Sequence, residues 1–242
     1  MIFMEKTVDA SPTKDFFIDM LTRDIGLEHA IIDLIDNSID GALTLRPNED
    51  FKGLWIKITI NENEFKIEDN CGGFSLVTAQ KYAFKFGRPS TRPDVDHSVG
   101  RFGVGMKRAL FKMGNHFIVE SRHTIDHFSV EVDVKKWSAN DQTNWNFEYL
   151  DGGNLLTAEN GTCIIVDQLH NSIKSQFRIS SYLNYLKKEI EKKHEINLSK
   201  GIQISLNGEN MGSNPVLLSF SDKLQPISRL LAKVVTFADE QI

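Results

Sequence analysis

The chain has 242 residues, 40% of them hydrophobic, and 16 phenylalanines against 6 prolines, which is enough apolar material for a sizeable core. This composition excludes a disordered or low-complexity chain, and no apolar run reaches the roughly 18 residues of a membrane span. The formal charge of −5 differs from that of a protein that wraps nucleic acid, which is usually basic. Two distant cysteines, Cys71 and Cys163, fit neither a disulfide framework nor a zinc site. We therefore expect reduced thiols in a cytoplasmic protein that does not contact a membrane.

The first half of the chain shows both helical and strand periodicity. Hydrophobic spacing predicts three helices, over residues 13–25, 27–45 and 75–84. Alternation predicts two strands, over 54–60 and 64–69, joined by a turn. Residues 85–102 combine glycines and prolines with polar side chains and predict a long loop, which in a compact domain is usually functional.

The second half favours a sheet with further helices. The pattern predicts helices over 103–113 and 175–193, and strands near 115–122, 126–134, 144–150, 161–167 and 201–206. The last strand ends at Asn207-Gly208, which is a hairpin turn signal. The fold class is therefore α+β, with one mostly antiparallel sheet covered by helices on one face.

The helix over 27–45 carries four polar side chains within an arc of roughly 100°, which are Asp33, Asp36, Asn37 and Asp40. Its apolar side holds Ile31, Leu34, Ile35 and Ala42, together with Ser38. A solvated acidic face is one interpretation, although aspartate has poor helix propensity. The other is a site for a metal–phosphate group. An asparagine oxygen suits Mg²⁺, and a carboxylate one turn earlier can hydrogen-bond an attacking water.

Two further segments combine a strand with a glycine. The strand over 64–69 ends at Asp69 and enters a turn with Gly72 and Gly73, whereas Gly161 and Thr162 open a later apolar run. An ordinary turn and an ordinary strand start explain both segments. Alternatively, Asp69 is a buried acceptor for an exocyclic amine such as adenine N6, and the Thr162 hydroxyl reaches Asp69 or the base.

A glycine-rich segment precedes the helix over 103–113, with the sequence Gly100-Arg101-Phe102-Gly103-Val104-Gly105-Met106-Lys107. Free backbone amides and the helix dipole at such a position favour an anion, and Lys107 would add a positive charge near a phosphate. A single glycine-rich loop is weak support. The segment lacks Walker spacing, and it follows a loop rather than a strand, which argues against a dinucleotide-binding fold.

The four segments together, in this order and spacing, resemble the GHKL ATPase superfamily. Its members include gyrase B subunits, ninety-kilodalton heat-shock chaperones, histidine-kinase catalytic domains, MutL proteins and MORC proteins. The resemblance covers roughly residues 25–167 and is closest in motif to the MORC, MutL and chaperone members. It implies the Bergerat fold, a two-layer α/β sandwich, and it implies ATP and Mg²⁺ as ligands.

The resemblance also assigns roles to residues. Asn37 matches the Mg²⁺ ligand, Asp33 the group that activates water, Asp69 the adenine reader and Thr162 the threonine that closes the adenine site. Residues 85–102 match the ATP lid. The remaining residues expected to contact nucleotide are Asp40, Gly41, Gly73, Phe74, Gly100, Arg101, Phe102, Gly103, Val104, Gly105, Met106 and Lys107.

Two departures from the family pattern affect the functional prediction. Asp33 replaces the usual glutamate and is one methylene shorter, so the base is weak or the water lies closer to the helix. Asp36 is a less favoured base. Cys71 replaces a glycine, which is tolerable if its φ is not positive. The expected function is slow, Mg²⁺-dependent ATP hydrolysis coupled to lid closure and dimerisation. An ATP-gated binding switch with negligible turnover is the alternative, and a protein histidine kinase is less favoured.

The expected organisation is an ATP-binding domain over residues 1–212 and an extension over 213–242. In MutL, MORC and chaperone relatives a second, transducer-like domain supplies a lysine or arginine to the γ-phosphate, so the extension would begin such a domain in a larger protein. Expected partners are ATP or ADP, a second copy in a nucleotide-dependent homodimer, and a downstream protein or nucleic acid. Basic residues of the late helix (Lys187, Lys188, Lys192 and Lys193) alternate with glutamates and predict a solvated helix face.

Overall fold

The computed structural model describes residues 8, 10–47, 50–87, 104–156 and 159–213. The strands are β1 (Trp55–Ile60), β2 (Phe65–Asp69), β3 (Gly114–His123), β4 (Asp126–Asp133), β5 (Leu150–Asp151), β6 (Gly161–Leu169), β7 (Gln203–Leu206) and β8 (Glu209–Asn210). They form one sheet in the order β5-β4-β3-β6-β2-β1-β7-β8. In this part of the chain the neighbouring strands pair antiparallel, apart from the parallel pair β1 and β7.

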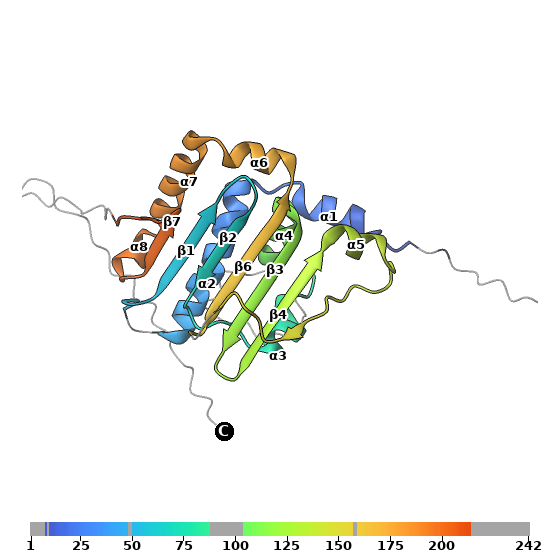
Figure 1. Cartoon of the computed structure of the whole chain (residues 1–242), viewed down its shortest axis with the longest axis horizontal. Helices are drawn as coiled ribbons and strands as arrows, with labels where there is room; N and C mark the ends of the chain where they lie inside the picture. Colours follow the sequence, from blue (N-terminus) through green and yellow to red (C-terminus); the bar gives the residue numbers. More distant parts are fainter. Residues whose placement is uncertain (1–7, 9, 48–49, 88–103, 157–158, 214–242) are drawn as a thin grey trace, which may run out of the picture.

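The helices are α1 (Lys14–Thr22), α2 (Leu27–Leu45), α3 (Leu76–Thr78), the π-helix η1 (Ala79–Ala83), α4 (Gly105–Met113), α5 (Val134–Ala139), α6 (Asn171–Phe177), α7 (Ser180–Lys193) and α8 (Glu195–Ser199). Figure 1 shows the sheet face-on, with α2 and α4 behind it. The fold is α+β, as the sequence predicts. None of the helices in the described ranges is both long and apolar enough to cross a bilayer.

The covered face of the sheet results from two different periodicities. Alternate residues of β2, namely Phe65, Ile67 and Asp69, are buried, and the buried residues of α2 recur at helical spacing and include Leu34 and Ser38. An apolar core therefore forms between the sheet and the helices. It also brings two polar side chains, Ser38 and Asp69, into the same interior.

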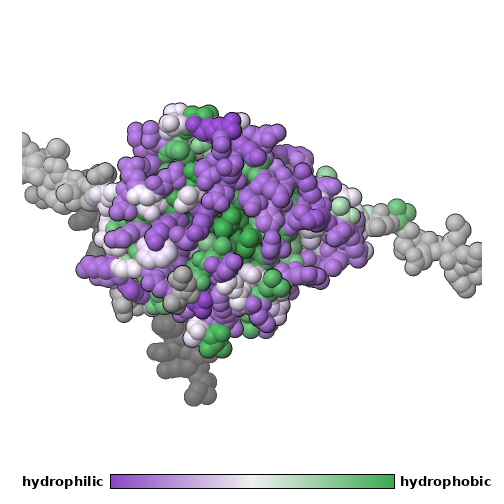
Figure 2. Space-filling model, viewed as in Figure 1, coloured by the Kyte–Doolittle hydropathy of each residue, from purple (hydrophilic) through white to green (hydrophobic). Residues whose placement is uncertain are grey.

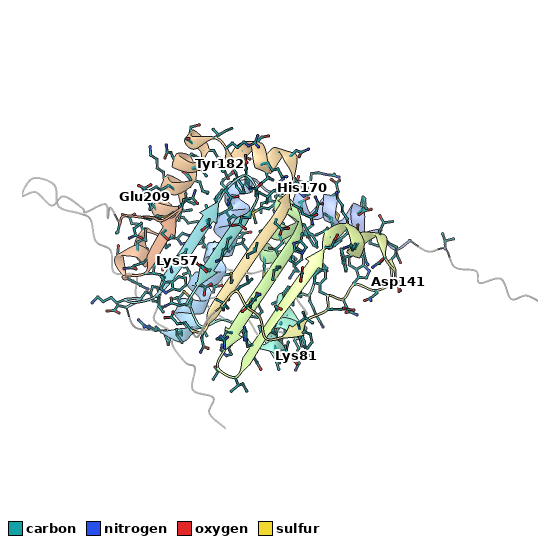
Figure 3. All side chains as sticks on the ribbon, viewed as in Figure 1. Lys57, Lys81, Asp141, His170, Tyr182 and Glu209 are labelled. Atoms are coloured by element: carbon teal, nitrogen blue, oxygen red, sulfur yellow. The ribbon has the colours of Figure 1, made fainter. Side chains whose placement is uncertain are left out.

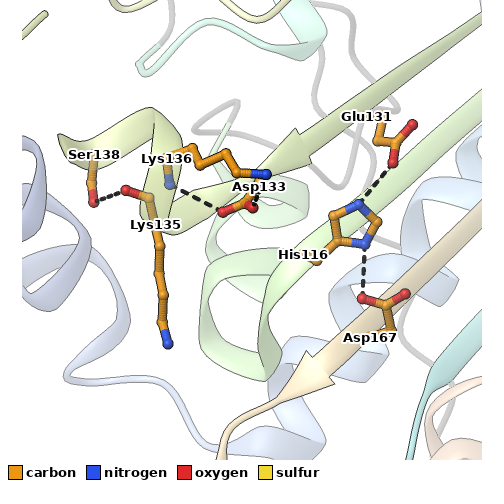
Figure 4. Close-up of polar contacts among 7 residues, drawn as sticks. All are labelled: His116, Glu131, Asp133, Lys135, Lys136, Ser138 and Asp167. Atoms are coloured by element: carbon orange, nitrogen blue, oxygen red, sulfur yellow. Dashed lines mark hydrogen bonds and ion pairs between the residues drawn. The ribbon is translucent and has the colours of Figure 1, made fainter. Parts of the chain in front are cut away.

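The opposite face of the sheet is polar. Figure 2 shows this face as largely hydrophilic, with an apolar strip across its middle, and Figure 3 places Lys57 on it. The His116 ring contacts two carboxylates there, with Nδ1 2.7 Å from Asp167 Oδ1 and Nε2 3.0 Å from Glu131 Oε1 (Figure 4). Cross-strand pairs of polar side chains of this kind suit a solvated face and leave the apolar residues to the helix side.

Residues 152–156 pass over the polar face between the edge strand β5 and the inner strand β6. The Leu155 and Leu156 amides donate to Glu120, at 2.8 and 3.0 Å, and His127 Nε2 lies 2.7 Å from the same carboxylate. Glu120 is consequently buried on a face that is otherwise solvated. These contacts fix the segment that leads into β6 and Thr162.

The predicted strand near 144–150 is wrong except at its last residue, because only Leu150–Asp151 pairs in the sheet. Trp145 and Phe147 alternate like strand residues, but they pack in an aromatic cluster with Trp137, at ring-centroid distances of 5.7 and 5.2 Å. A helix that the pattern did not predict, α5, begins just after β4. The Asp133 side chain caps it by accepting from Lys136 N.

The predicted helix over 175–193 is two helices, α6 and α7, because Ile179 adopts an extended conformation between them. The α7 helix lies beside α2 and the edge of the sheet, where Lys187 pairs with Glu209 of β8 (Figure 3 labels Glu209). Most of the predicted lid, residues 88–102, and the extension over 214–242 lie outside the described residues.

Candidate functional site

Asp69 is the centre of one end of the candidate site. Its carboxylate accepts from Ser38 Oγ at 2.8 Å, from the Cys71 amide at 2.8 Å and from the Thr162 amide at 3.3 Å. Burial outweighs these hydrogen bonds and raises the pKa of Asp69 to about 6. A carboxylate has about four acceptor positions, and three are used among the described residues. Asp69 therefore retains capacity for one more donor.

The glycine turn after Asp69 packs closely against the ends of β3 and β6. Gly73 has a φ of +62°, and a Cβ on it would lie 2.3 Å from the Arg122 carbonyl oxygen. Gly161 is equally tight, because its Cβ would lie 1.9 Å from the Asp69 carbonyl oxygen. Only glycine fits at these two places without moving the backbone. Cys71 is not among the residues with positive φ, which is the condition under which it is tolerated.

Phe74 directly follows the glycine turn in the chain. Its amide donates to Ser121 Oγ at 2.8 Å, and the same hydroxyl donates to the Phe74 carbonyl at 3.0 Å. The Phe74 ring packs edge-on against Phe128, with centroids 5.6 Å apart. Ser121 is fully buried. The sequence analysis missed Ser121, and its inward position on β3 is the signal that identifies it.

The polar face of α2 forms the other end of the site. Asn37 is exposed, and its side chain makes no hydrogen bond within the described part of the chain, whereas Asp33 is half-buried. Asp33 lies against the start of α4, since a Cβ on Gly105 would be 3.4 Å from Asp33 Oδ2. Asp40 is partly buried, and Gly41 lets α2 approach the Asp69 turn, because its Cβ would lie 2.7 Å from the Cys71 carbonyl oxygen.

The charge around Asp33 comes from three helices. Burial raises the pKa of Asp33, and the negative charge of Asp36 raises it further, whereas Lys193, Arg108 and His29 oppose this shift. Asp33 therefore holds its proton more tightly than an exposed aspartate does. A general base works best with a pKa nearer to the working pH, so this direction suits proton abstraction from water.

Asp36 points toward α7 rather than along the shared polar face. Lys193 Nζ lies 2.9 Å from Asp36 Oδ2, and His194 Nε2 lies 3.7 Å from Asp36 Oδ1. Asp36 is buried, whereas the Lys193 side chain is 46% exposed. Lys193 therefore lies on a solvated helix face, as the charge pattern of the late helix predicts, and its ammonium also pairs with Asp36.

Lys107 lies in the first turns of α4 and is fully buried. Its Nζ donates to the Ala83 carbonyl oxygen at 2.6 Å, at the end of η1, and lies 5.9 Å from the centre of the Phe86 ring. Burial lowers the pKa of Lys107 to about 8. Val104 and Met106 flank Gly105 and are partly buried. Gly100, Arg101, Phe102 and Gly103 lie outside the described residues.

The structure brings Thr162 to Asp69, but through the backbone amide and not through the hydroxyl. It also adds Ser38, which the helical pattern places on the apolar side of α2. A serine among leucines and isoleucines on a buried helix face needs a hydrogen-bond partner. That requirement is the signal that would have identified Ser38.

The comparison with known families agrees with this geometry. A family model described as histidine kinase-, DNA gyrase B-, and HSP90-like ATPase matches residues 25–158 of the 242. The chain belongs to this GHKL-type ATPase family. Its sheet and covering helices are the Bergerat fold of that family. No curated protein is significantly similar to the chain in sequence.

The residues present suit the nucleotide and the metal that this family binds. The remaining acceptor capacity of Asp69 matches an exocyclic amine. The glycines beside Asp69 have no side chains, so a ligand can approach the backbone closely there. In the described part of the chain no three histidine, cysteine or acidic side chains form a metal cluster. The exposed Asn37 side chain offers an amide oxygen, which is a ligand type that Mg²⁺ accepts alongside phosphate and water.

Proposed function

We propose that this chain binds ATP with Mg²⁺ and hydrolyses it slowly, as the nucleotide-driven switch of a larger assembly. The observation that carries the proposal is the buried Asp69 carboxylate, held by Ser38, Cys71 and Thr162 with one acceptor position remaining. Such a group selects an adenine amine, because a base that presents an acceptor there leaves two acceptors facing each other.

At the phosphate end, Asn37 would hold Mg²⁺, which supplies charge stabilisation to the phosphates when bound. Asp33 would accept a proton from water as the water oxygen attacks the γ-phosphorus and ADP leaves. The start of α4, with Val104, Gly105 and Met106, offers backbone amides to the phosphates. Lys107 would add its charge after leaving the Ala83 carbonyl.

Lid closure over residues 85–102 and nucleotide-dependent dimerisation are parts of the same proposal. They rest on the resemblance to MORC, MutL and chaperone members, in which ATP orders a loop and joins two copies. Residues 213–242 would begin the second domain that completes such a switch, and a protein or nucleic acid would be its downstream partner.

Calorimetry with ATP, ADP and GTP, each with magnesium, tests the proposal. ATP and ADP should bind and GTP should bind at least about 10-fold more weakly, because guanine presents an oxygen where adenine has its amine. No binding of ATP or ADP to the folded protein would overturn it. Phosphate release under single-turnover conditions then separates hydrolysis from the alternative, an ATP-gated switch with negligible turnover.

A further inference from the structure

The end of α7 places a positive charge beside the candidate catalytic helix. Tyr182, Leu186 and Ile190 form a buried stripe at four-residue spacing that packs α7 onto the domain. The Glu191 carboxylate accepts from the Gly212 amide at 3.2 Å, and Lys187 pairs with Glu209. These contacts fix α7 along its length, so the position of its last residue, Lys193, is set by the fold.

Asp36 is an acidic side chain buried at the contact between α2 and α7. The Lys193 ammonium donates to its Oδ2 at 2.9 Å. His194 is the other basic residue there, but it is almost completely buried, and its Nε2 has no hydrogen-bond partner among the described residues. Burial lowers the pKa of His194, so near neutral pH this ring is uncharged. Lys193 is therefore the cation that compensates Asp36.

Asp33 lies three residues before Asp36, which makes the two side chains neighbours on the helix surface. The charged and titratable groups that face Asp33 within the described residues are Asp36 and His29 on α2, Arg108 on α4 and Lys193 on α7. With Lys193 in place, the pair Asp36–Lys193 is close to neutral. Without it, Asp33 would face an uncompensated buried negative charge.

We propose that Lys193 is a positioning residue for the ATPase site, because it neutralises Asp36 and thereby keeps the neighbouring Asp33 carboxylate ionised and able to accept a proton from water. This inference rests on the proposed role of Asp33. It assigns a purpose to Asp36 that differs from catalysis, and it links α7, through Lys193, to the chemistry on α2.

The experiment compares the pH dependence of kcat, between pH 5 and 8.5, for the wild type and three single variants. The acid limb of this profile is the pH range in which kcat falls as Asp33 becomes protonated. In Lys193→Gln this limb should move up by about 0.5 to 1 pH unit. The kcat value above the limb and the affinity for ATP should stay within about twofold of the wild-type values. Lys193→Arg keeps the charge and should restore the wild-type limb. Lys192→Gln is the matched control, because Lys192 is the adjacent exposed lysine and has no ion pair among the described residues.

A double variant separates charge from packing. Asp36→Asn combined with Lys193→Gln removes both members of the pair and should return the acid limb toward that of the wild type. An unmoved limb in Lys193→Gln, or an equal movement in Lys192→Gln, would overturn the inference. If Lys193→Gln fails to fold, Lys193→Met provides the same loss of charge while preserving the apolar part of the side chain.

A second readout keeps this inference distinct from the proposed function. The side-chain carboxyl resonance of Asp33, assigned by its loss in Asp33→Asn, can be titrated by ¹³C NMR in the nucleotide-free protein. If the wild type shows no ATP turnover, the proposed hydrolysis is refuted, but the Asp33 resonance still tests the role of Lys193. The Asp33 resonance should titrate about 0.5 to 1 pH unit higher in Lys193→Gln than in the wild type. Identical titrations in the two proteins would refute the role of Lys193.

Discussion

The two ends of the site differ in how completely the fold assembles them. At the proposed adenine end, Asp69 is buried and accepts from three donors, one on α2, one in the turn after β2 and one on β6. At the phosphate end, Asn37 is exposed, and Lys107 donates to the Ala83 carbonyl. The proposed base recognition would thus be built into the contact between sheet and helices. The proposed phosphate contact would require Lys107 to leave the Ala83 carbonyl, so we expect nucleotide binding to rearrange this end.

The largest expected effect is at the phosphate end. Asp33→Asn removes the proton acceptor and should lower the rate of ATP hydrolysis by about 10²- to 10⁴-fold. Affinity for ATP should change little, because Asp33 does not belong to the adenine end. Phosphate release and calorimetry on the same preparation measure the two quantities. Asp24→Asn, an exposed aspartate just before α2, is the control, and unchanged turnover in Asp33→Asn would remove Asp33 from the mechanism.

The adenine end should respond in the opposite way, through affinity. Asp69→Asn replaces one acceptor oxygen with an NH₂ donor. This donor would face the protein donors that now bind the carboxylate, and it would also face the adenine amine. We expect affinity for ATP and ADP to fall by about 100-fold. Calorimetry measures this. Glu68→Gln is the matched control, since Glu68 lies next along β2 on the polar face and pairs with Lys66 at 2.9 Å; an equal loss there would contradict the assignment.

The pairing of Ser38 with Asp69 shows what the sequence can and cannot provide. The helical period places Ser38 on the buried face of α2, and the strand period places Asp69 on the buried face of β2, so each inward position is predictable. Their contact joins residues 31 positions apart and depends on how α2 crosses the sheet. Local periodicity carries no information on that crossing.

The errors in the sequence analysis have a related cause. Trp145 and Phe147 alternate like strand residues but pack against Trp137 instead of pairing. Lys193 is exposed, as its mixed charge run predicts, but the run does not show that its ammonium pairs with the buried Asp36. In both places the local pattern does not show the long-range partner. The four family motifs were recognisable because each is a short local sequence.

The third prediction concerns the stability of the fold at the glycine turn of the adenine end. Gly73→Ala forces a side chain into a φ of +62° and against the Arg122 carbonyl. We expect a loss of about 2 to 4 kcal/mol in the free energy of unfolding. Gly208→Ala is the control, because Gly208 has a φ of +82° with nothing within 4 Å of its Cβ, and it should cost only about 1 kcal/mol. Urea unfolding compares them, and equal losses would show that the tight contact contributes nothing.

The smallest effect is a proton taken up when ATP binds. Burial lowers the pKa of Lys107 to about 8, from 10.5 in the unfolded chain, so folding favours the neutral amine. This group then destabilises the fold as pH falls from about 10 toward 8, and near pH 8 roughly half of the free protein carries the charge. A phosphate beside Lys107 favours the ammonium and raises its pKa again. ATP binding at pH 8 should therefore take up at most about half a proton.

Calorimetry in buffers of different ionisation enthalpy measures this uptake. It should decline toward zero near pH 6.5, where Lys107 is already charged, and it should disappear in Lys107→Met. Adenosine lacks phosphates and should bind without proton uptake. If ATP binds with no uptake at pH 8, Lys107 keeps its bond to the Ala83 carbonyl. The phosphate end would then be as fixed as the adenine end. The two ends would differ only in that Asn37 is exposed to solvent and Asp69 is buried.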